Sequence, residues 1–428
     1  MIILDSALER LEAEGRPLRL GIVGSGYMAR GIAGQVLAGM PGLRIGGFAA
    51  RNLDAAAAIL SEFGIEAAPA VDDGEVAGAL REHRPLVTSD HALLCAATGI
   101  DAIVETTGEV EFGAGVALDA IRSGKHVVLV NAELDATVGP ILKTHAEDAG
   151  VVLTNTDGDE PGVAMNLLRY VRSIGLRPVL TGNIKGFIDP YRTPETQAAF
   201  AESVGQRPKM ITSFADGTEL AMETTIVANA TGFGVARRGM NGWQCSHVRE
   251  VLDLVSPERF ADGGLVDYVL GAEPGSGAFV VGLSEEPVRQ QYLKYFKMGD
   301  GPLYLFYTPW HLPQAEAPLT AARAVLFHDA SVTPLSGPSC DVVTIAKRDL
   351  STGETLDGIG GFTCFGAIEN IAASRRANLL PMGLSEGCTL VRDVERDTAL
   401  TYDDVELPAG RLADRLRAEQ NRRFGSSA

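Results

Sequence analysis

The sequence predicts an α/β protein whose N-terminal part is a doubly wound parallel sheet. Three observations support this fold class. Short apolar segments alternate with helical segments over about the first 160 residues, a glycine-rich turn follows the first apolar segment, and the chain has 428 residues. Because single cores stop growing at roughly 250 to 300 residues, we expect two or three domains.

The composition is that of a folded, acidic protein. With 37 Lys and Arg against 55 Asp and Glu, the formal net charge is −18, and 46% of the residues are hydrophobic. This charge repels nucleic acids and anionic membranes, so we expect neither as a partner. The sequence shows no signal-peptide pattern and no apolar span of about 18 residues, which predicts a cytoplasmic protein. The five cysteines are far apart and odd in number, which argues against a disulfide framework or a zinc site.

The first apolar segment, Leu18–Val23, and the turn after it predict a dinucleotide site. The turn has the pattern G-x-G-x-x-A and leads into a helix that ends near Leu37. Its first glycine permits a tight turn, its second lets a pyrophosphate approach the backbone, and its alanine lets helix and strand pack closely. A glycine turn without a ligand is the alternative. The predicted cofactor-binding residues of the turn are Gly24, Ser25, Gly26, Tyr27, Met28 and Ala29.

The following segments predict the rest of a Rossmann-type sheet. We expect strands at 43–50, 101–105, 126–130 and 151–155, with helices at 53–62, 110–123 and 138–149 between them. Ligands of such sheets bind beyond the carboxyl ends of the strands. The predicted cofactor contacts at these strand ends are Thr106, Thr107, Gly108, Asn131, Ala132 and Glu133.

The end of the second strand favours NADP(H) over NAD(H). NAD enzymes tend to place an acid there, which binds the ribose 2′-hydroxyl, whereas this chain has Arg51 and Asn52. Arg51 can pair with a 2′-phosphate, which an acid would repel. The alternative is that Arg51 is a solvated residue at a helix start and that Asp54 serves the ribose.

A polar segment at 181–192, after an expected strand at 178–180, predicts a functional loop. Lys185 can donate a proton to a carbonyl or hold an anion, and Arg192 can clamp a phosphate or carboxylate. The alternative is that both are surface cations. Since the protein is strongly acidic, we predict catalytic roles for both.

Paired acids form a third candidate feature. We expect a polar turn at 213–219 and an apolar helix at 220–230, so that Glu219 and Glu223 share one helical face. With Glu160, these acids can orient hydroxyls, relay a proton or hold Mg²⁺ or Mn²⁺, and all three are predicted to be catalytic. A charged first turn that satisfies the helix dipole is the alternative.

Two further features carry weaker signals. His311 stands beside Trp310, and such a histidine more often packs than acts in catalysis. A glycine cluster at 358–362 leads into an expected helix at 367–374. Because no strand is expected before this cluster, we predict no second dinucleotide site there.

The order of the motifs resembles homoserine dehydrogenase over about the first 160 residues. The resemblance rests on the glycine turn, on 101–108 and on 126–132. Two departures matter, because that family usually has lysines where this chain has Glu133 and Glu223. An enzyme without both lysines is not expected to reduce aspartate semialdehyde in the same way.

The whole chain is more similar to a branch of homoserine dehydrogenase-like oxidoreductases with a C-terminal SAF domain. This branch includes the 1-deoxy-D-xylulose 5-phosphate reductoisomerase-like enzyme, or DRL, of isoprenoid biosynthesis. The similarity implies a Rossmann NAD(P)-binding domain at 1–160, an α+β substrate-binding, catalytic and dimerisation domain at 161–374, and a small β-rich SAF-like module at 375–428. It also implies NADPH as cofactor and a homo-oligomer, either a dimer or a tetramer. The similar segments are 182–186, 189–192, 213–218, 299–304, 390–394 and 399–405.

Three functions follow as hypotheses. The first is an NADP(H)-dependent oxidoreductase of a small phosphorylated polyol or hydroxycarbonyl compound. The second is a dehydrogenase or nicotinamide-dependent epimerase of an unphosphorylated substrate. The third is a cofactor-sensing or scaffold protein, which would bind a dinucleotide without turnover.

Overall fold

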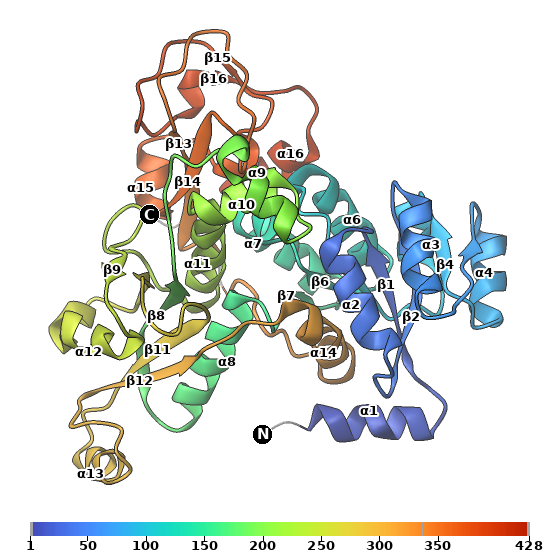
Figure 1. The fold of residues 1–428 in the computed structure, drawn as a ribbon, viewed down its shortest axis with the longest axis horizontal. Coiled ribbons are helices and arrows are strands. Elements are labelled where there is room, and N and C mark those ends of the chain that lie inside the picture. Colours follow the sequence, from blue (N-terminus) through green and yellow to red (C-terminus); the bar gives the residue numbers. More distant parts are fainter. Residues whose placement is uncertain (1–2, 336, 426–428) are drawn as a thin grey trace. The chain divides into compact units, whose positions relative to one another are not determined.

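The computed structural model describes residues 3–335 and 337–425, which form two compact units (Figure 1). The first unit runs to Gly158 and also includes Leu312–Thr333 and Arg415–Gln420. The second unit contains Asp159–His311, Pro334–Asp414 and the described residues from Asn421 onward. Each unit has its own sheet and its own apolar core.

The sheet of the first unit confirms the predicted doubly wound fold. Its strands are β1 (Leu18–Val23), β2 (Leu43–Ala49), β3 (Ala68–Pro69), β4 (Leu86–Thr88), β5 (Ala102–Glu105), β6 (His126–Leu129) and β7 (Leu153–Asn155). All pairings are parallel, in the order β3-β4-β2-β1-β5-β6-β7. The order reverses at β1, and ligands of such sheets bind where the order reverses, here at the carboxyl ends of β1 and β5.

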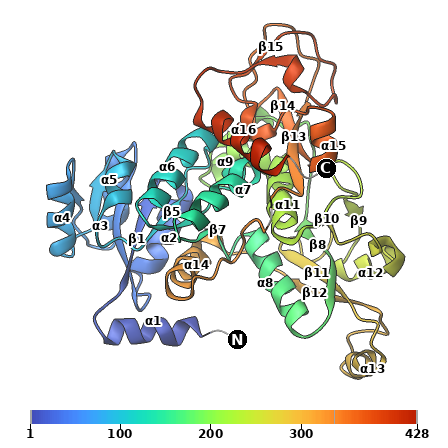
Figure 2. The same ribbon diagram turned by 180° about the vertical axis from the view of Figure 1, so that it is seen from behind.

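Helices cover both faces of this sheet. They are α1 (Leu4–Ala13), α2 (Tyr27–Leu37), α3 (Leu53–Ser61), α4 (Asp73–Arg81), α5 (His91–Ala96), α6 (Val110–Arg122), α7 (Ala132–Asp148) and α14 (Pro313–Phe327). In both views α2 lies beside α14, while α6 lies beside α7 (Figures 1 and 2). Ile22, Val104 and Val128 of the central strands are fully buried, as expected for a parallel sheet covered on both sides.

Some details of this unit differ from the prediction. The short strands β3 and β4 were not expected, because two or three residues carry too little pattern to identify a strand. Helix α7 starts at Ala132 rather than at residue 138, because the Asn131 side chain caps it by accepting a hydrogen bond from the Leu134 N–H at 3.0 Å.

Two distant segments return to the first unit. In α14, Arg323 forms an ion pair with Asp157 at 2.6 Å. Helix α16 (Leu412–Phe424) supplies Arg417, which donates to the Thr137 carbonyl at 3.1 Å, and Gln420, whose Oε1 accepts from the Ile141 N–H at 3.2 Å. Side chains thus tie both segments to the sheet and to α7.

The second unit is built on a mixed sheet. Its strands are β8 (Arg177–Lys185), β9 (Trp243–Gln244), β10 (Leu265–Leu270), β11 (Ala278–Leu283) and β12 (Leu303–Thr308). Their order is β12-β11-β8-β10-β9, with β11 antiparallel to β8 and β12, and β10 parallel to β8 and β9. Helices α8 (Glu160–Ser173) and α11 (Thr218–Thr231) pack on this sheet. An apolar cluster around Ile184, Phe260 and Phe279 forms its core.

The C-terminal part of the second unit consists of small antiparallel strand pairs. These are β13 (Cys340–Ala346) with β14 (Cys364–Asn370), and β15 (Thr389–Leu390) with β16 (Val405–Glu406). The predicted helix at 367–374 is wrong for its first four residues, because Ala367–Asn370 pair with β13, and helix α15 covers Ile371–Arg376. An apolar cluster that includes Leu350, Leu380 and Leu400 holds this part together.

The remaining helices of the second unit complete the fold. They are α9 (Pro194–Ser203), α10 (Pro208–Ala215), α12 (Val251–Leu254) and α13 (Pro287–Tyr295), with single 3-10 turns at Val248–Glu250, Pro257–Phe260, Met382–Leu384 and Tyr402–Asp404. Among the described residues, no helix combines the length and the apolarity needed to cross a membrane.

Candidate functional site

The glycine turn of the first unit forms a cradle between β1 and β5. Gly24 has φ +121°, a conformation that favours glycine, and a Cβ there would collide with Thr106 Oγ1. Thr106 in turn donates its hydroxyl to the Val23 carbonyl at 2.8 Å. The two strand ends therefore approach each other only because residue 24 has no side chain.

The second glycine of the turn leaves the start of α2 open. Gly26 is the N-cap of α2 and supplies no side-chain cap, and a Cβ there would meet nothing within 4 Å. Ala29, one turn later, is fully buried. An exposed helix N-terminus with room in front of it fits the pyrophosphate of a dinucleotide, so the residues present fit this cofactor.

At the end of β2, the predicted residues Arg51 and Asn52 differ in whether their side chains are available to a cofactor. Asn52 caps α3, where its Oδ1 accepts from the Ala55 N–H at 3.0 Å. Arg51 is exposed and its guanidinium lies 3.0 Å from Glu109 Oε1. Arg51 is thus accessible to a 2′-phosphate, whereas the Asn52 side chain is used within the protein.

The predicted contacts at the ends of β5 and β6 also divide into two groups. Thr106, Thr107 and Gly108 are partly exposed. Ala132 and Glu133 are buried in the first turn of α7, and the side chain of Asn131 is almost wholly buried. The residues after β5 are therefore accessible to a ligand, and those after β6 lie inside the unit.

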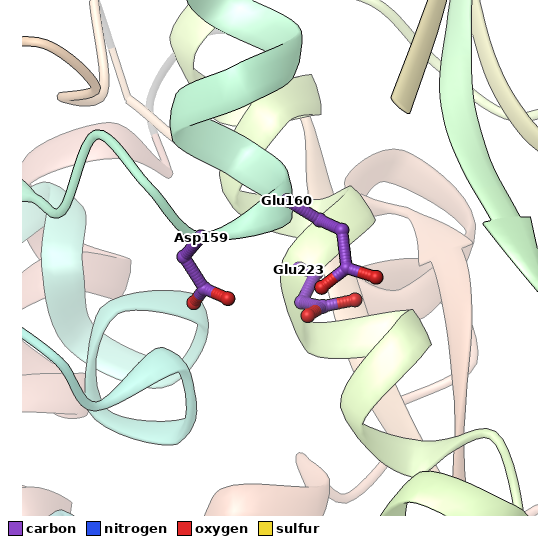
Figure 3. A group of neighbouring side chains, drawn as sticks. All are labelled: Asp159, Glu160 and Glu223. Atoms are coloured by element: carbon purple, nitrogen blue, oxygen red, sulfur yellow. The ribbon is translucent and has the colours of Figure 1, made fainter. Parts of the chain in front are cut away.

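In the second unit, a charged cluster forms around Lys185. This residue ends β8, and its Nζ lies 2.6 Å from Glu160 Oε1 and 3.2 Å from Glu223 Oε2. Glu160 is the first residue of α8 and Glu223 belongs to α11 (Figure 3). With Lys185 of β8, three elements therefore supply the cluster. Lys185 is part of a strand and not of the predicted loop, because Thr181–Lys185 continue the pairing of β8 with β10.

Asn183, two residues before Lys185, joins the same cluster. Its Nδ2 donates to Glu223 Oε2 at 2.7 Å, which is possible because side chains two apart on a strand share a face. Asn183 was not among the predicted site residues. The alternation of Asn183, the apolar Ile184 and Lys185 was the available signal, since it is typical of a strand with one polar face.

Buried charge shifts the pKa values of the cluster in different directions. Burial raises the pKa of Glu223 well above its usual value, and the nearby Glu160 raises it further. Burial alone would raise the pKa of Glu160 too, but Lys185, the hydrogen bond with Glu223 and His311 outweigh burial and lower it to about 2. The pKa of Lys185 is raised, because Glu160 and Glu223 outweigh its burial. Glu160 is therefore the carboxylate that pairs with the Lys185 ammonium, while burial favours the protonated form of Glu223.

His311 lies at the edge of the cluster. Its Nε2 is 3.6 Å from Glu160 Oε2, and its Nδ1 is 3.0 Å from the hydroxyl of Ser276. His311 follows Trp310 in the sequence. Its ring lies between the Ser276 hydroxyl and the Glu160 carboxylate. The structure thus favours the role in the site that the sequence left open.

Three carboxylates of the cluster have the arrangement of cation ligands. Asp159, Glu160 and Glu223 each place an oxygen within 4.8 Å of the others (Figure 3). Burial and Glu160 together raise the pKa of Asp159 to about 6. However, the ammonium of Lys185 already lies against two of these acids, and a divalent cation there would meet strong repulsion. The residues present do not fit a metal ion while Lys185 keeps this position.

The other two predicted catalytic residues, Arg192 and Glu219, have different surroundings. Arg192 Nε pairs with Asp189 Oδ2 at 3.0 Å, and its guanidinium lies 5.1 Å from the centre of the Phe187 ring. Glu219 is partly exposed in the first turn of α11, and its charge helps to raise the pKa values of Lys185 and Glu223. The predicted turn at 213–219 is wrong in part, because Ser213–Ala215 end α10 and only Asp216 and Gly217 turn.

A second buried ion pair supports the start of α11. Lys347 Nζ lies 2.7 Å from Asp216 Oδ2, and both side chains are buried. The same ammonium donates to the carbonyls of Arg192 at 2.8 Å and Gly361 at 2.7 Å. Lys347 thereby joins the strand pair β13–β14 to the backbone that carries Arg192 and Glu219.

One family model matches the chain in this region. Residues 158–317 match the catalytic domain of oxidoreductase DRL. The matched segment contains Lys185 and its acidic partners, together with Asn183 and His311. The match agrees with the resemblance to the DRL branch over these residues, while the SAF-like character of the C-terminal module and the homoserine dehydrogenase likeness stay predictions.

Solved structures with remote similarity include dehydrogenases. A UDP-N-acetylglucosamine 3-dehydrogenase from Acidithiobacillus ferrooxidans is 13% identical, with 74% of this chain and 92% of that chain covered and a TM-score of 0.42. A myo-inositol dehydrogenase from Lactobacillus casei is 12% identical, with coverage of 62% and 72% and a TM-score of 0.37. Similarity this remote identifies no substrate. No curated protein matches the sequence.

Proposed function

We propose that the protein is an NADP(H)-dependent oxidoreductase of a small, phosphorylated polyol or hydroxycarbonyl compound. The observation that carries the proposal is the Lys185 cluster, which lies in the segment similar to an oxidoreductase catalytic domain. The first unit would hold the dinucleotide through the Gly24–Ala29 turn, with Arg51 on the 2′-phosphate. When bound, the nicotinamide supplies or accepts a hydride.

Lys185 is suited to stabilise the oxygen of the carbonyl that is reduced. Its side chain is partly exposed, and its ammonium is held by Glu160, which stays ionised at neutral pH. As negative charge develops on the oxygen, Lys185 donates a proton to it, because an alkoxide is a far stronger base than an amine. Glu223, whose raised pKa favours its protonated form and whose Oε2 lies 3.2 Å from the Lys185 Nζ, can then return a proton to the amine. One hydride and one proton convert the carbonyl to an alcohol.

The phosphorylated substrate class rests on charge. In a chain of net charge −18, an anion needs a local cation, and Arg192 is half exposed near the end of β8. Its present partner is Asp189, which a phosphate would have to displace. This existing pair supports a second candidate, a dehydrogenase or nicotinamide-dependent epimerase of an unphosphorylated substrate. Net consumption of NADPH separates a reduction from an epimerisation.

The test combines binding and turnover. Purified protein is titrated with NADPH and NADH by fluorescence and is then assayed with matched phosphorylated and unphosphorylated hydroxycarbonyl compounds. We expect Lys185→Met to lower kcat by at least about a thousandfold and to leave the Kd for NADPH unchanged, because the lost group acts on the reacting oxygen.

Lys294→Met is the control, because Lys294 is an exposed lysine of α13 paired with Asp300. Undiminished turnover by Lys185→Met would remove the catalytic role of Lys185. Failure of the unmodified protein to bind either dinucleotide would remove the proposed function.

A further inference from the structure

Glu105 is a buried acid at the end of β5 that no prediction singled out. It is the last residue of the strand, pairs in register with Val23 of β1 and Leu129 of β6, and is fully buried. The partly exposed residues Thr106 and Thr107 follow it directly. A carboxyl group is costly to bury unless donors surround it, so the contacts of Glu105 call for an explanation.

Three donors converge on this carboxylate. The Thr107 N–H donates to Oε1 at 2.8 Å, and the Thr107 hydroxyl donates to the same oxygen. Asn131 Nδ2 donates to Oε2 at 2.7 Å. Burial raises the pKa of Glu105, and these hydrogen bonds oppose that effect. The geometry is that of an acceptor surrounded by donors, which only a carboxylate satisfies on both oxygens.

Both side-chain amide atoms of the partner Asn131 form hydrogen bonds inside the unit. Its Nδ2 also donates to the Glu109 carbonyl at 3.3 Å, and its Oδ1 accepts from Leu134 at the start of α7. Glu109 is the N-cap of α6. Through Asn131, the Glu105 carboxylate therefore fixes the turn after β5 and the starts of two helices.

The turn that Glu105 holds also forms one wall of the dinucleotide cradle. Thr106 is the residue against which Gly24 packs without a Cβ, and it is hydrogen-bonded to Val23. A shift of the Thr106–Gly108 turn would move this wall. Because the Glu105 carboxylate holds Thr107 by two hydrogen bonds, it controls the width of the cradle.

We propose that Glu105 is a positioning residue for the dinucleotide, which holds the Thr106–Gly108 turn in the binding geometry without contacting the cofactor. The inference rests on the proposed function only in requiring that the cradle binds a nicotinamide dinucleotide. It also reassigns Asn131, which acts as a link to Glu105 rather than as a side-chain ligand of the cofactor.

The test compares Glu105→Gln with Asp101→Asn. An amide at 105 keeps the shape but directs an NH₂ group toward Thr107 or Asn131, where a donor meets a donor. Asp101 precedes the same strand at its opposite end, is also raised in pKa by burial, and accepts from the Arg19 N–H at 2.7 Å. Both variants therefore remove a carboxylate that accepts from a backbone N–H, Glu105 at the end of β5 and Asp101 just before its start.

We expect Glu105→Gln to raise the Kd for NADPH about tenfold, corresponding to one lost charge-assisted hydrogen bond. Asp101→Asn should leave the Kd for NADPH unchanged, even if its thermal midpoint falls as far as that of Glu105→Gln. Thr107→Val, which removes one donor and keeps the fold of the turn, should raise the Kd in the same direction and serves if Glu105→Gln does not fold.

An unchanged Kd in Glu105→Gln and Thr107→Val, or an equal rise in Asp101→Asn, would overturn the positioning role and leave the proposed function standing. Absence of binding by the unmodified protein would overturn both.

Discussion

The dinucleotide cradle and the Lys185 cluster are built in different ways. The cradle is contiguous, since one turn of six residues supplies most of it and the fold supplies a neighbouring strand end. The cluster is assembled from α8, β8 and α11, and its members Glu160, Lys185 and Glu223 are separated by 25 and 38 residues along the chain. A contiguous site is specified by local conformation, whereas an assembled one is specified by packing and charge.

Two buried acids, one in each unit, have opposite pKa shifts. In the second unit, Glu160 has the ammonium of Lys185 beside it, and its pKa falls to about 2. In the first unit, burial raises the pKa of Asp135 to about 7, and only a long hydrogen bond from Asn155, at 3.5 Å, opposes this. Asp135 Oδ1 has no hydrogen-bond partner among the described residues. The close contact with an ammonium keeps Glu160 ionised, whereas Asp135, which has no such contact, favours its protonated form.

A substitution at Gly24 should break the cradle and leave the cluster intact. In Gly24→Ala the new Cβ collides with Thr106 Oγ1 at a φ of +121°. We expect the Kd for NADPH to rise by at least about tenfold, and the free energy of unfolding to fall by about 1 to 3 kcal/mol, because of strain at this φ. Fluorescence titration and chemical denaturation measure the two effects.

Gly115→Ala is the matched control for that experiment. Gly115 lies in α6, and a Cβ there meets nothing within 4 Å, so this variant should be slightly more stable and bind NADPH normally. If Gly24→Ala binds NADPH as tightly as the unmodified protein, the cradle is not where the dinucleotide binds.

The contrast between the sites explains how far the sequence could predict them. The strand Leu18–Val23 and the end of α2 at Leu37 were predicted with the bounds that the structure shows, because strand, turn and helix signals follow one another there, although α2 already starts at Tyr27. Lys185 was predicted as a candidate, but its position in a strand and its partner Asn183 were not. Polar residues on one face of a buried strand resemble a loop when the sheet that covers their apolar neighbours is unknown.

Other contacts had no local signal at all. The pair of Asp216 and Lys347 joins residues 131 positions apart, and Lys347 follows a strand that sequence pattern did not predict. Likewise, Arg323 and Gln420 belong to the first unit although segments of the second unit precede them in the sequence. Such contacts depend on the tertiary fold, and single-sequence periodicity does not contain them.

The difference between buried acids predicts a pH dependence that Asp135→Asn should remove. The folded-state pKa of Asp135 is raised, so between about pH 4 and pH 7 the folded protein keeps a proton that the unfolded chain releases. The free energy of unfolding therefore falls as pH rises through this window. We expect Asp135→Asn to gain about 1 to 3 kcal/mol relative to the unmodified protein between pH 5 and pH 8, measured by chemical denaturation.

Asp73→Asn, which changes an exposed acid of α4, should show no such gain. Glu160 has the opposite sign, since its lowered pKa stabilises the fold above the unfolded pKa near 4.5 and loses that effect as pH falls toward 2. If the free energy of unfolding depends on pH in the same way for Asp135→Asn and for the unmodified protein, Asp135 is not held as a neutral acid.

Arg51 provides the smallest expected effect and the finest test of the cradle. Its guanidinium is largely exposed and its ion pair with Glu109 is a surface pair, which contributes little to stability. Arg51→Ala should therefore leave the thermal midpoint unchanged and raise the Kd for NADPH about tenfold, because one charge-assisted contact to a 2′-phosphate is lost. The Kd for NADH should stay the same, since NADH has no phosphate there. If NADH binds more tightly than NADPH to the unmodified protein, and Asp54→Asn weakens it, then Asp54 serves the ribose and Arg51 is a solvated residue at the start of α3.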